Sequence, residues 1–220
     1  MRLLNKQFVE GFNTLVTPIG NILEASRVHP HAVTITGFLF SIASGVLFWL
    51  GHFVWAGVMI ILSGVCDVLD GRLARKTARI TPFGALLDST IDRYSEIAIF
   101  MGLAAYFNSK YVTALIILVI AGSLLTSYTR ARAEGLGIDC KVGLMQRPER
   151  LTFLATAAIL GSLLDRALGA RDIITRYEIV NHFFASGQIL IKIALLAIAV
   201  LANVTVIQRM IHVSRKLKLE

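Results

Sequence analysis

Four aspartates are the residues of this sequence whose type and spacing most clearly indicate chemistry: Asp67, Asp70, Asp88 and Asp92. The first two are three residues apart and the last two are four apart, so each pair shares a face if its segment is helical. If the two faces meet, the carboxylates repel one another and take up protons unless cations neutralise them. Salt bridges to neighbouring arginines are the alternative, although they account for only one or two of the carboxylates.

The type of ligand indicates which cations would bind. All-oxygen ligands suit Mg²⁺ or Mn²⁺ rather than zinc. We therefore expect two divalent cations, Mg²⁺ or Mn²⁺, which would clamp a phosphoryl group and its leaving group.

Small residues and one arginine lie between these aspartates: Gly71, Ala74, Arg75 and Gly84. Small residues let a ligand approach a helix backbone, and they also favour close helix packing in membranes. Arg75 is suited to hold phosphate oxygens, or it is a solvated charge at the end of its helix. From residue types alone, both interpretations stay open.

The segments that carry these residues are strongly apolar. Of the 220 residues, 55% are hydrophobic and 16% are charged, against about 25% charged in a soluble domain. No Lys, Arg, Asp or Glu occurs between Arg27 and Asp67, and further charge-free runs cover residues 111–129 and 193–208. Runs of about 18 or more apolar residues are typical of helices that cross a membrane.

We predict an all-α fold: one polytopic membrane domain over residues 1–220, with six transmembrane helices forming a bundle within residues 29–212. Prolines, glycines and polar residues indicate where these helices end. The predicted spans cover about 32–50, 54 to beyond 71, 82–108, 110 to beyond 132, 148–164 and 183–211. Residues 1–28 are amphipathic, which suits an N-terminal interfacial helix on the membrane, or equally an ordinary frayed N-terminus.

Basic residues gather at one set of helix ends. The net charge is +8, and most Lys and Arg fall within residues 2–27, 72–79, 130–150 and 209–218. The positive-inside rule places those ends in the cytoplasm, so we expect an integral protein of the cytoplasmic membrane whose aspartates face the cytoplasm. Membrane lipids explain the basic charge better than nucleic acid, which we do not expect as a partner.

Read together, the residues of the aspartate segment resemble the signature of the CDP-alcohol phosphatidyltransferases. The matched pattern is Asp67-x2-Asp70-Gly71-x2-Ala74-Arg75-x8-Gly84-x3-Asp88-x3-Asp92. The resemblance implies an enzyme that transfers a phosphatidyl group from a CDP-lipid, such as CDP-diacylglycerol, to the hydroxyl of an alcohol and releases CMP. It also suggests a homodimer.

The same resemblance implies roles for individual residues. The metal ligands would be Asp67, Asp70, Asp88 and Asp92, and Asp92 would also be the catalytic base. The CDP-binding residues would be Gly71, Ala74, Arg75 and Gly84. The family commonly has Pro-Asn-x2-Thr at the start of its first helix, where this chain has Pro30-His31-x2-Thr34. Thr34 is therefore a candidate nucleotide contact, and His31 is left unassigned.

Four arginines near the predicted cytoplasmic ends of the last helices are candidates for binding the phosphate of an anionic acceptor: Arg130, Arg147, Arg150 and Arg209. Guanidinium groups bind phosphate in a bidentate way, although positive-inside bias produces the same pattern. The segments 88–93, 127–134 and 147–150 resemble the prokaryotic phosphatidylinositol-phosphate synthases. That branch implies a phosphorylated polyol, inositol 1-phosphate, as acceptor. Arg130 stands where the branch commonly has lysine.

Other functions remain open at this point. Residues 165–181 form a longer segment than the branch usually has, and their role is not indicated. Glycerol 3-phosphate, another phosphorylated polyol, or an archaeal-type ether lipid donor would fit the same chemistry. A membrane prenyltransferase also holds pyrophosphate with aspartates and Mg²⁺, and an ion carrier would explain acidic groups in a membrane. The Asp-Gly-x2-Ala-Arg block does not fit a prenyltransferase, for which six spans are also too few. An ion carrier does not explain the small-residue spacing or the arginine cluster.

Overall fold

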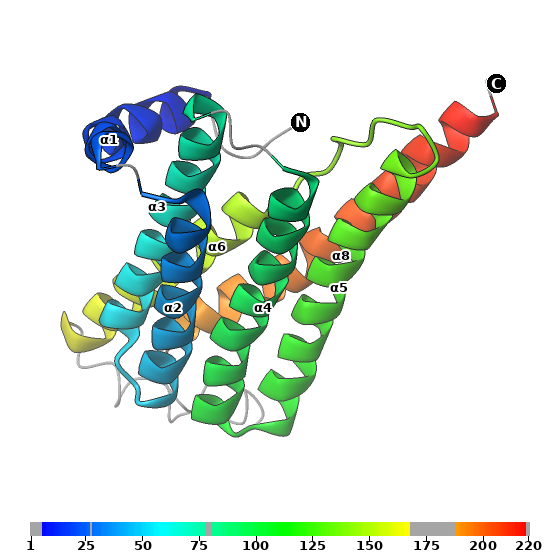
Figure 1. Cartoon of the computed structure of the whole chain (residues 1–220). Helices are drawn as coiled ribbons and strands as arrows, with labels where there is room; N and C mark the ends of the chain where they lie inside the picture. The colour runs from blue at the N-terminus through cyan, green and yellow to red at the C-terminus, as the bar shows by residue number, and fades with distance from the viewer. Residues whose placement is uncertain (1–5, 27, 78–80, 168–187, 219–220) are drawn as a thin grey trace. The chain divides into compact units, whose positions relative to one another are not determined.

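The computed structural model describes residues 6–26, 28–77, 81–167 and 188–218, and these residues are folded into α-helices joined by short loops (Figure 1). The helices are α1 Lys6–Ala25, α2 Pro30–Trp49, α3 Phe53–Lys76, α4 Pro82–Phe107, α5 Lys110–Glu134, α6 Arg147–Ala167 and α8 Ile189–Leu217. The all-α prediction is confirmed. Residues 1–5, 78–79, 168–181 and 183–187, which entered the predictions above, lie outside the described residues.

Prolines mark the beginnings of three helices. Pro30 opens α2, Pro82 opens α4 and Pro148 is the second residue of α6. Proline is tolerated there because the first-turn N–H groups of a helix have no intrahelical partner. The Oγ1 of Thr81 also accepts a hydrogen bond of 3.0 Å from the Gly84 N–H and so caps α4.

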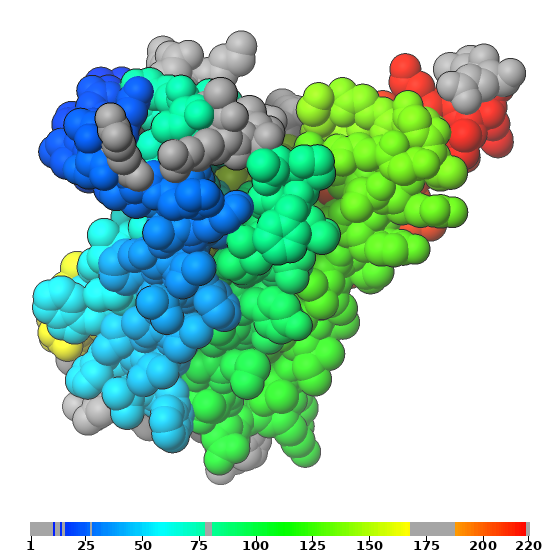
Figure 2. Space-filling view, in the orientation of Figure 1, coloured from blue at the N-terminus to red at the C-terminus, as the bar shows by residue number. Residues whose placement is uncertain are grey.

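Among the described residues, four helices are long and apolar enough to cross a membrane: α2, α3, α5 and α8. α4 and α6 have 26 and 21 residues but are less apolar by this measure. The count of six spans therefore stays a prediction. α2 lies at the surface along most of its length (Figure 2). One of its faces exposes large apolar side chains at helical spacing, namely Ile35, Leu39, Ile42, Val46 and Trp49, as expected of a helix that contacts lipid.

The chain divides into two compact units, which we call the 4–106 unit and the 107–220 unit. In the 4–106 unit, α3 packs against both α2 and α1, and α1 lies across the end of α3 (Figure 1). Val16 of α1, Val33 of α2, and Leu69 and Leu73 of α3 form a buried apolar cluster at this junction. The cluster lies on the turns of α3 that also carry Asp67 and Asp70.

Glycines bring α2 very close to two other helices of this unit. A Cβ added at Gly37 would lie 2.9 Å from Cβ of Cys66 on α3. Further along α2, a Cβ added at Gly45 would overlap the Ala98 carbonyl oxygen of α4, and one at Gly102 would overlap the Gly45 carbonyl oxygen. Small residues at such crossings let helix backbones approach. α2 therefore holds α3 and α4, the two helices that carry the aspartates, against one common neighbour.

The crossing of α2 and α4 gives a first prediction. We expect Gly102→Ala to destabilise the protein by about 1–3 kcal/mol, because the new methyl group must push apart two backbones rather than a flexible side chain. The thermal unfolding midpoint of the purified protein in detergent measures this loss. Gly64→Ala on α3 is the matched control, since a Cβ there meets nothing within 4 Å. Equal midpoints for the two variants would contradict the prediction.

In the 107–220 unit, α8 packs against both α5 and α6. Polar side chains support the contact between α5 and α8. The Oγ1 of Thr126 donates to the Ala202 carbonyl oxygen at 3.2 Å, and the Nδ2 of Asn203 donates to the Leu118 carbonyl oxygen at 3.3 Å. The unit thus has one long central helix, α8, with α5 and α6 packed on it.

Candidate active site

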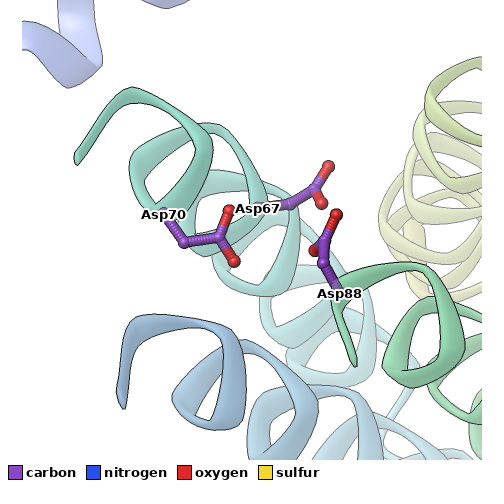
Figure 3. A group of neighbouring side chains, drawn as sticks. All are labelled: Asp67, Asp70 and Asp88. Atoms are coloured by element: carbon purple, nitrogen blue, oxygen red, sulfur yellow. The ribbon is translucent and has the colours of Figure 1, made fainter. Parts of the chain in front are cut away.

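Three of the four predicted metal ligands come together in the 4–106 unit. Asp67 and Asp70 project from α3 and Asp88 projects from α4, and one carboxylate oxygen of each lies within 4.8 Å of the others (Figure 3). The group is partly to fully buried, with Asp70 only 6% exposed. Carboxylates held so close and shielded from water repel one another unless a cation is bound between them. Their oxygen atoms are the ligands that Mg²⁺ and Mn²⁺ prefer, so the residues fit a divalent metal site.

Asp92 does not belong to this group of three. It follows Asp88 by one turn of α4 and is half-buried. The predicted meeting of four carboxylates is therefore seen for three, and Asp92 lies one turn further along the helix. This difference in position suits a role distinct from that of the other three aspartates.

Thr34 of α2 contacts the aspartate group directly. Its Oγ1 donates a hydrogen bond of 2.6 Å to Oδ2 of Asp70, and it also lies 3.2 Å from the Pro30 carbonyl oxygen. The sequence indicated only a nucleotide contact for this residue. The structure adds a bond from Thr34 to a predicted metal ligand, which spacing along the chain could not reveal because the bond joins two helices. The nucleotide contact of Thr34 stays a prediction.

This contact gives a second prediction. We expect Thr34→Val to lower kcat/KM by about tenfold and to raise the concentration of divalent cation needed for activity, because partners that orient metal ligands typically contribute 10- to 100-fold. Titration of activity with Mn²⁺ measures the effect. Thr36→Val is the control on the same helix, since among the described residues the Thr36 hydroxyl bonds its own helix at the Ala32 carbonyl oxygen. An unchanged cation requirement in Thr34→Val would contradict this role.

The small residues of the motif lie beside polar side chains. A Cβ added at Gly71 would be 3.4 Å from the Arg75 guanidinium, so this side chain folds back along α3 over Gly71. A Cβ added at Gly84 would lie 3.0 Å from Oγ1 of Thr81 and 3.1 Å from the His31 ring. Ala74 is half-buried on α3. At Gly71 the added atom would only touch a flexible side chain, whereas at Gly84 it would be crowded by Thr81 and His31, so Gly84 is the more restrictive of the two positions.

Arg72 is a site neighbour that sequence reasoning missed. Its guanidinium donates to Oγ1 of Thr17 at 2.6 Å and to Oδ1 of Asn21 at 3.2 Å, and both acceptors lie on α1. One turn later, Lys76 pairs with Glu24 of α1 at 2.6 Å. These contacts fasten α1 to the part of α3 that follows Asp70. The sequence shows polar residues on both α1 and α3, but it does not show which residue of one helix pairs with which residue of the other.

The predicted acceptor arginines belong to the 107–220 unit. Arg209 is 3% exposed, and its Nε donates to the Val142 carbonyl oxygen at 2.9 Å while a second nitrogen donates to the Thr126 carbonyl oxygen. Arg130 and Arg150 both lie close enough to Arg209 for their positive charges to act on it. The structure thus brings these three arginines into one region, which we call the arginine group.

The members of the arginine group differ in their surroundings. Arg150 is 1% exposed and donates to the Met145 carbonyl oxygen at 3.2 Å. Arg130 is more exposed, and its Nε pairs with Oε1 of Glu134 at 2.8 Å. Arg147 is half-buried at the first residue of α6. Arg150 and Arg209 each donate to a backbone carbonyl of the loop before α6, so they also shape that loop, a role that composition did not indicate.

Comparison with known proteins decides the family. The model of the CDP-alcohol phosphatidyltransferase family matches residues 27–212. The chain belongs to this family. It is therefore a CDP-alcohol phosphatidyltransferase, and with its four apolar helices it is an integral membrane protein. Family membership also excludes the alternatives of a prenyltransferase and an ion carrier.

Relatives of this phosphatidyltransferase carry more specific names. It is 35% identical over 186 residues to the archaetidylinositol phosphate synthase of Methanothermobacter thermautotrophicus, covering 84% of this chain and 83% of the relative. It is 34% identical over 221 residues to the phosphatidylinositol phosphate synthase of Streptomyces avermitilis, covering 97% and 84%. The resemblance to the phosphatidylinositol-phosphate synthase branch is thus confirmed.

Solved structures agree with this placement. The phosphatidylinositol phosphate synthase of Mycobacterium tuberculosis with CDP-DAG bound superimposes with a TM-score of 0.71 at 28% identity, covering 91% of this chain and 94% of that one. The same protein in complex with manganese and citrate gives a TM-score of 0.71 at 29% identity, covering 90% and 88%. A phosphatidyltransferase of similar fold and sequence therefore binds manganese, in keeping with the aspartate group described above.

Proposed function

We propose that this phosphatidyltransferase transfers the phosphatidyl group of CDP-diacylglycerol to a hydroxyl of inositol 1-phosphate, giving phosphatidylinositol phosphate and CMP. The observation that carries the proposal is the group of Asp67, Asp70 and Asp88 within the family motif, since it is suited to hold the cations that a pyrophosphate donor requires. The names of the bacterial relatives support inositol phosphate as the acceptor.

In the proposed reaction, Asp92 takes the proton from the acceptor hydroxyl. The acceptor oxygen then forms a bond to the phosphorus on the lipid side of the pyrophosphate, while the bond from that phosphorus to the bridging oxygen breaks and CMP leaves with that oxygen. Two divalent cations, Mg²⁺ or Mn²⁺, when held by the aspartates, neutralise the charge of the pyrophosphate. In-line displacement of this kind depends mainly on positioning and charge stabilisation.

The other motif residues have binding roles in this proposal. Gly71, Ala74 and Gly84 leave room for the CDP moiety, and Arg75 donates hydrogen bonds to its phosphates. Thr34 serves the site through its bond to Asp70. The arginine group, with Arg147, binds the phosphate of the acceptor through guanidinium N–H groups, which match phosphate oxygens in a bidentate way.

The acceptor is tested by a screen of the purified enzyme. CMP release is measured with CDP-diacylglycerol and either inositol 1-phosphate, free inositol or glycerol 3-phosphate, and the lipid product is identified by mass spectrometry. We expect inositol 1-phosphate to give the highest kcat/KM. A preference for glycerol 3-phosphate or for free inositol would overturn the acceptor assignment but not the reaction class.

One observation supports an alternative to CDP-diacylglycerol as the lipid donor. Two relatives, at 35% and 29% identity, are archaetidylinositol phosphate synthases. An archaeal-type ether lipid is therefore the alternative donor, with the acceptor and the residues unchanged. The same screen, repeated with the CDP-activated ether lipid, distinguishes the two donors by their kcat/KM values.

A third prediction concerns Arg209. We expect Arg209→Ala to raise KM for inositol 1-phosphate by about ten- to a hundredfold, because a charged hydrogen bond contributes about 1.5–3 kcal/mol. Steady-state kinetics with several phosphorylated acceptors measures the effect. Arg132→Ala is the control, since Arg132 is an exposed arginine at the end of α5. If KM were unchanged for every phosphorylated acceptor, the phosphate-binding role would be wrong.

The membrane arrangement is also part of the proposal. α4 and α6 are each long enough to cross the bilayer, since about 20 residues suffice, so we propose six spans within residues 29–212 of one domain. The motif and the arginine group face the cytoplasm, as the distribution of basic residues predicts. Exposed Ile19 and Ile22 support an interfacial position for α1.

The oligomeric state is a separate part of the proposal. We propose a homodimer, as the family resemblance suggests, and the mass of the purified protein in detergent tests it.

A further inference from the structure

The first turn of α6 holds buried polar atoms that no described residue satisfies. Glu149 is 6% exposed, and its Oε2 accepts no hydrogen bond from the part of the chain that the structure describes. Nε2 of Gln146, the residue that immediately precedes α6, is buried and donates none to the same residues. Burial of an unsatisfied acceptor or donor costs free energy, and native proteins rarely retain such atoms without a ligand, water or function.

These two side chains share a face with Arg150. Gln146, Glu149 and Arg150 are three and four residues apart, the spacing of neighbours on one side of a helix. The Arg150 N–H donates to the Gln146 carbonyl oxygen at 3.1 Å, so the helical register already includes Gln146. One short stretch of chain therefore presents an amide donor, a carboxylate acceptor and a buried guanidinium together.

The loop before α6 ties this stretch to the arginine group. The Met145 N–H donates to Oγ1 of Thr205 on α8 at 3.0 Å, and the Met145 carbonyl oxygen accepts from Arg150 at 3.2 Å. Three residues earlier, the Val142 carbonyl oxygen accepts from Nε of Arg209 at 2.9 Å. The unsatisfied atoms thus belong to the same buried region as the arginines to which the proposed function assigns the acceptor phosphate.

We propose that Glu149 and Gln146 bind hydroxyl groups of the phosphorylated polyol acceptor and select it by its number of hydroxyls. The inference rests on the proposed function. A carboxylate oxygen accepts a hydrogen bond from a hydroxyl, and an amide N–H donates one to a hydroxyl oxygen. Inositol 1-phosphate retains several hydroxyls besides the one that attacks phosphorus, whereas glycerol 3-phosphate retains a single one. The ring polyol offers a separate hydroxyl to each buried atom, whereas glycerol 3-phosphate has a single hydroxyl that would have to reach both.

A site built to hydrogen-bond a hydroxyl discriminates strongly against substrates that lack it, because its own polar groups are then left unpaired. Removal of the carboxylate should therefore reduce selectivity rather than the chemical step. Glu149→Gln replaces a charged acceptor with a neutral one, so we expect it to raise KM for inositol 1-phosphate by about tenfold, with kcat and the KM for CDP-diacylglycerol nearly unchanged. KM for glycerol 3-phosphate should change much less. The selectivity ratio, which is kcat/KM for inositol 1-phosphate divided by kcat/KM for glycerol 3-phosphate, therefore falls.

The experiment measures CMP release by the full-length enzyme with both acceptors, for wild type, Glu149→Gln, Gln146→Ala and Asp139→Asn. Asp139 is an exposed acid of the preceding loop that pairs with Lys141, so its variant should keep the wild-type ratio. Gln146→Ala should also lower this ratio, and it provides the readout if the Glu149→Gln protein fails to fold. Thermal midpoints identify variants that are merely destabilised.

The outcomes separate the inference from the proposed function. If wild type releases no CMP with inositol 1-phosphate, the proposed function fails. If wild type does so but the selectivity ratio of the folded Glu149 and Gln146 variants equals that of wild type, the inference is wrong. An equal rise of KM for both acceptors would also overturn it, because that result indicates a structural role at the start of α6.

Discussion

The Asp92→Asn enzyme is expected to bind CDP-diacylglycerol but to release CMP at least about a hundredfold more slowly than wild type, since general-base catalysis typically contributes 10²- to 10⁴-fold. The amide that replaces the carboxylate keeps the size of the side chain and loses the ability to take a proton. Because Asp92 does not belong to the group formed by Asp67, Asp70 and Asp88, its change should leave that group intact.

Two measurements test this expectation. Turnover is followed by CMP release at saturating inositol 1-phosphate, and donor binding by the rise in thermal midpoint that CDP-diacylglycerol produces. Asp139→Asn controls for the loss of one negative charge. Unchanged turnover in folded Asp92→Asn protein would refute the base assignment. Loss of donor binding together with turnover would instead show that Asp92 acts mainly as a ligand of the donor site.

Chelation of divalent cations should abolish CMP release, and Mg²⁺ or Mn²⁺ should restore it. The reason is that three carboxylates with oxygens within 4.8 Å of one another cannot hold an anionic pyrophosphate without cations to neutralise both. Asp88→Asn removes the single member of the group that comes from α4. We expect it to lose about a hundredfold or more in activity at low cation concentration and to require more Mn²⁺ for half-maximal rate.

The cation experiment also has a readout that does not depend on turnover. Wild-type protein should show a higher thermal midpoint with Mn²⁺ than with EDTA, because a ligand that binds the folded state stabilises it. Asp88→Asn should show a smaller difference, and Asp139→Asn should match wild type. Full activity after chelation, or equal stabilisation of Asp88→Asn and wild type by Mn²⁺, would contradict the metal site.

Local patterns in the sequence predicted the helices well, because their causes are local. Charge-free runs identified α2, α5 and α8, and prolines at positions 30, 82 and 148 identified the starts of α2, α4 and α6 within two residues. The two aspartate pairs lie on α3 and α4 as their spacing indicated. The aspartate motif identified the family, which the comparison confirmed over residues 27–212.

The metal group itself was only partly predictable. Spacing along one helix shows that Asp67 and Asp70 share a face, but it does not tell how far along α4 the partner carboxylate must lie. That distance depends on where the helices cross, and the crossings are set by Gly37 and Gly45 of α2. The structure consequently brings Asp88 to the group, while Asp92 is one turn away.

By itself, then, the sequence determined the reaction class, the metal-binding chemistry and the order of helices in this protein. Those properties follow from residue type and from periodicity within single helices. Tertiary structure alone decided that Thr34 orients Asp70, that Arg72 fastens α1 beside the site, and that Arg209 bonds the loop before α6. Each of these contacts joins segments far apart in the chain, and close packing of the helices selects it rather than any pattern within one of them.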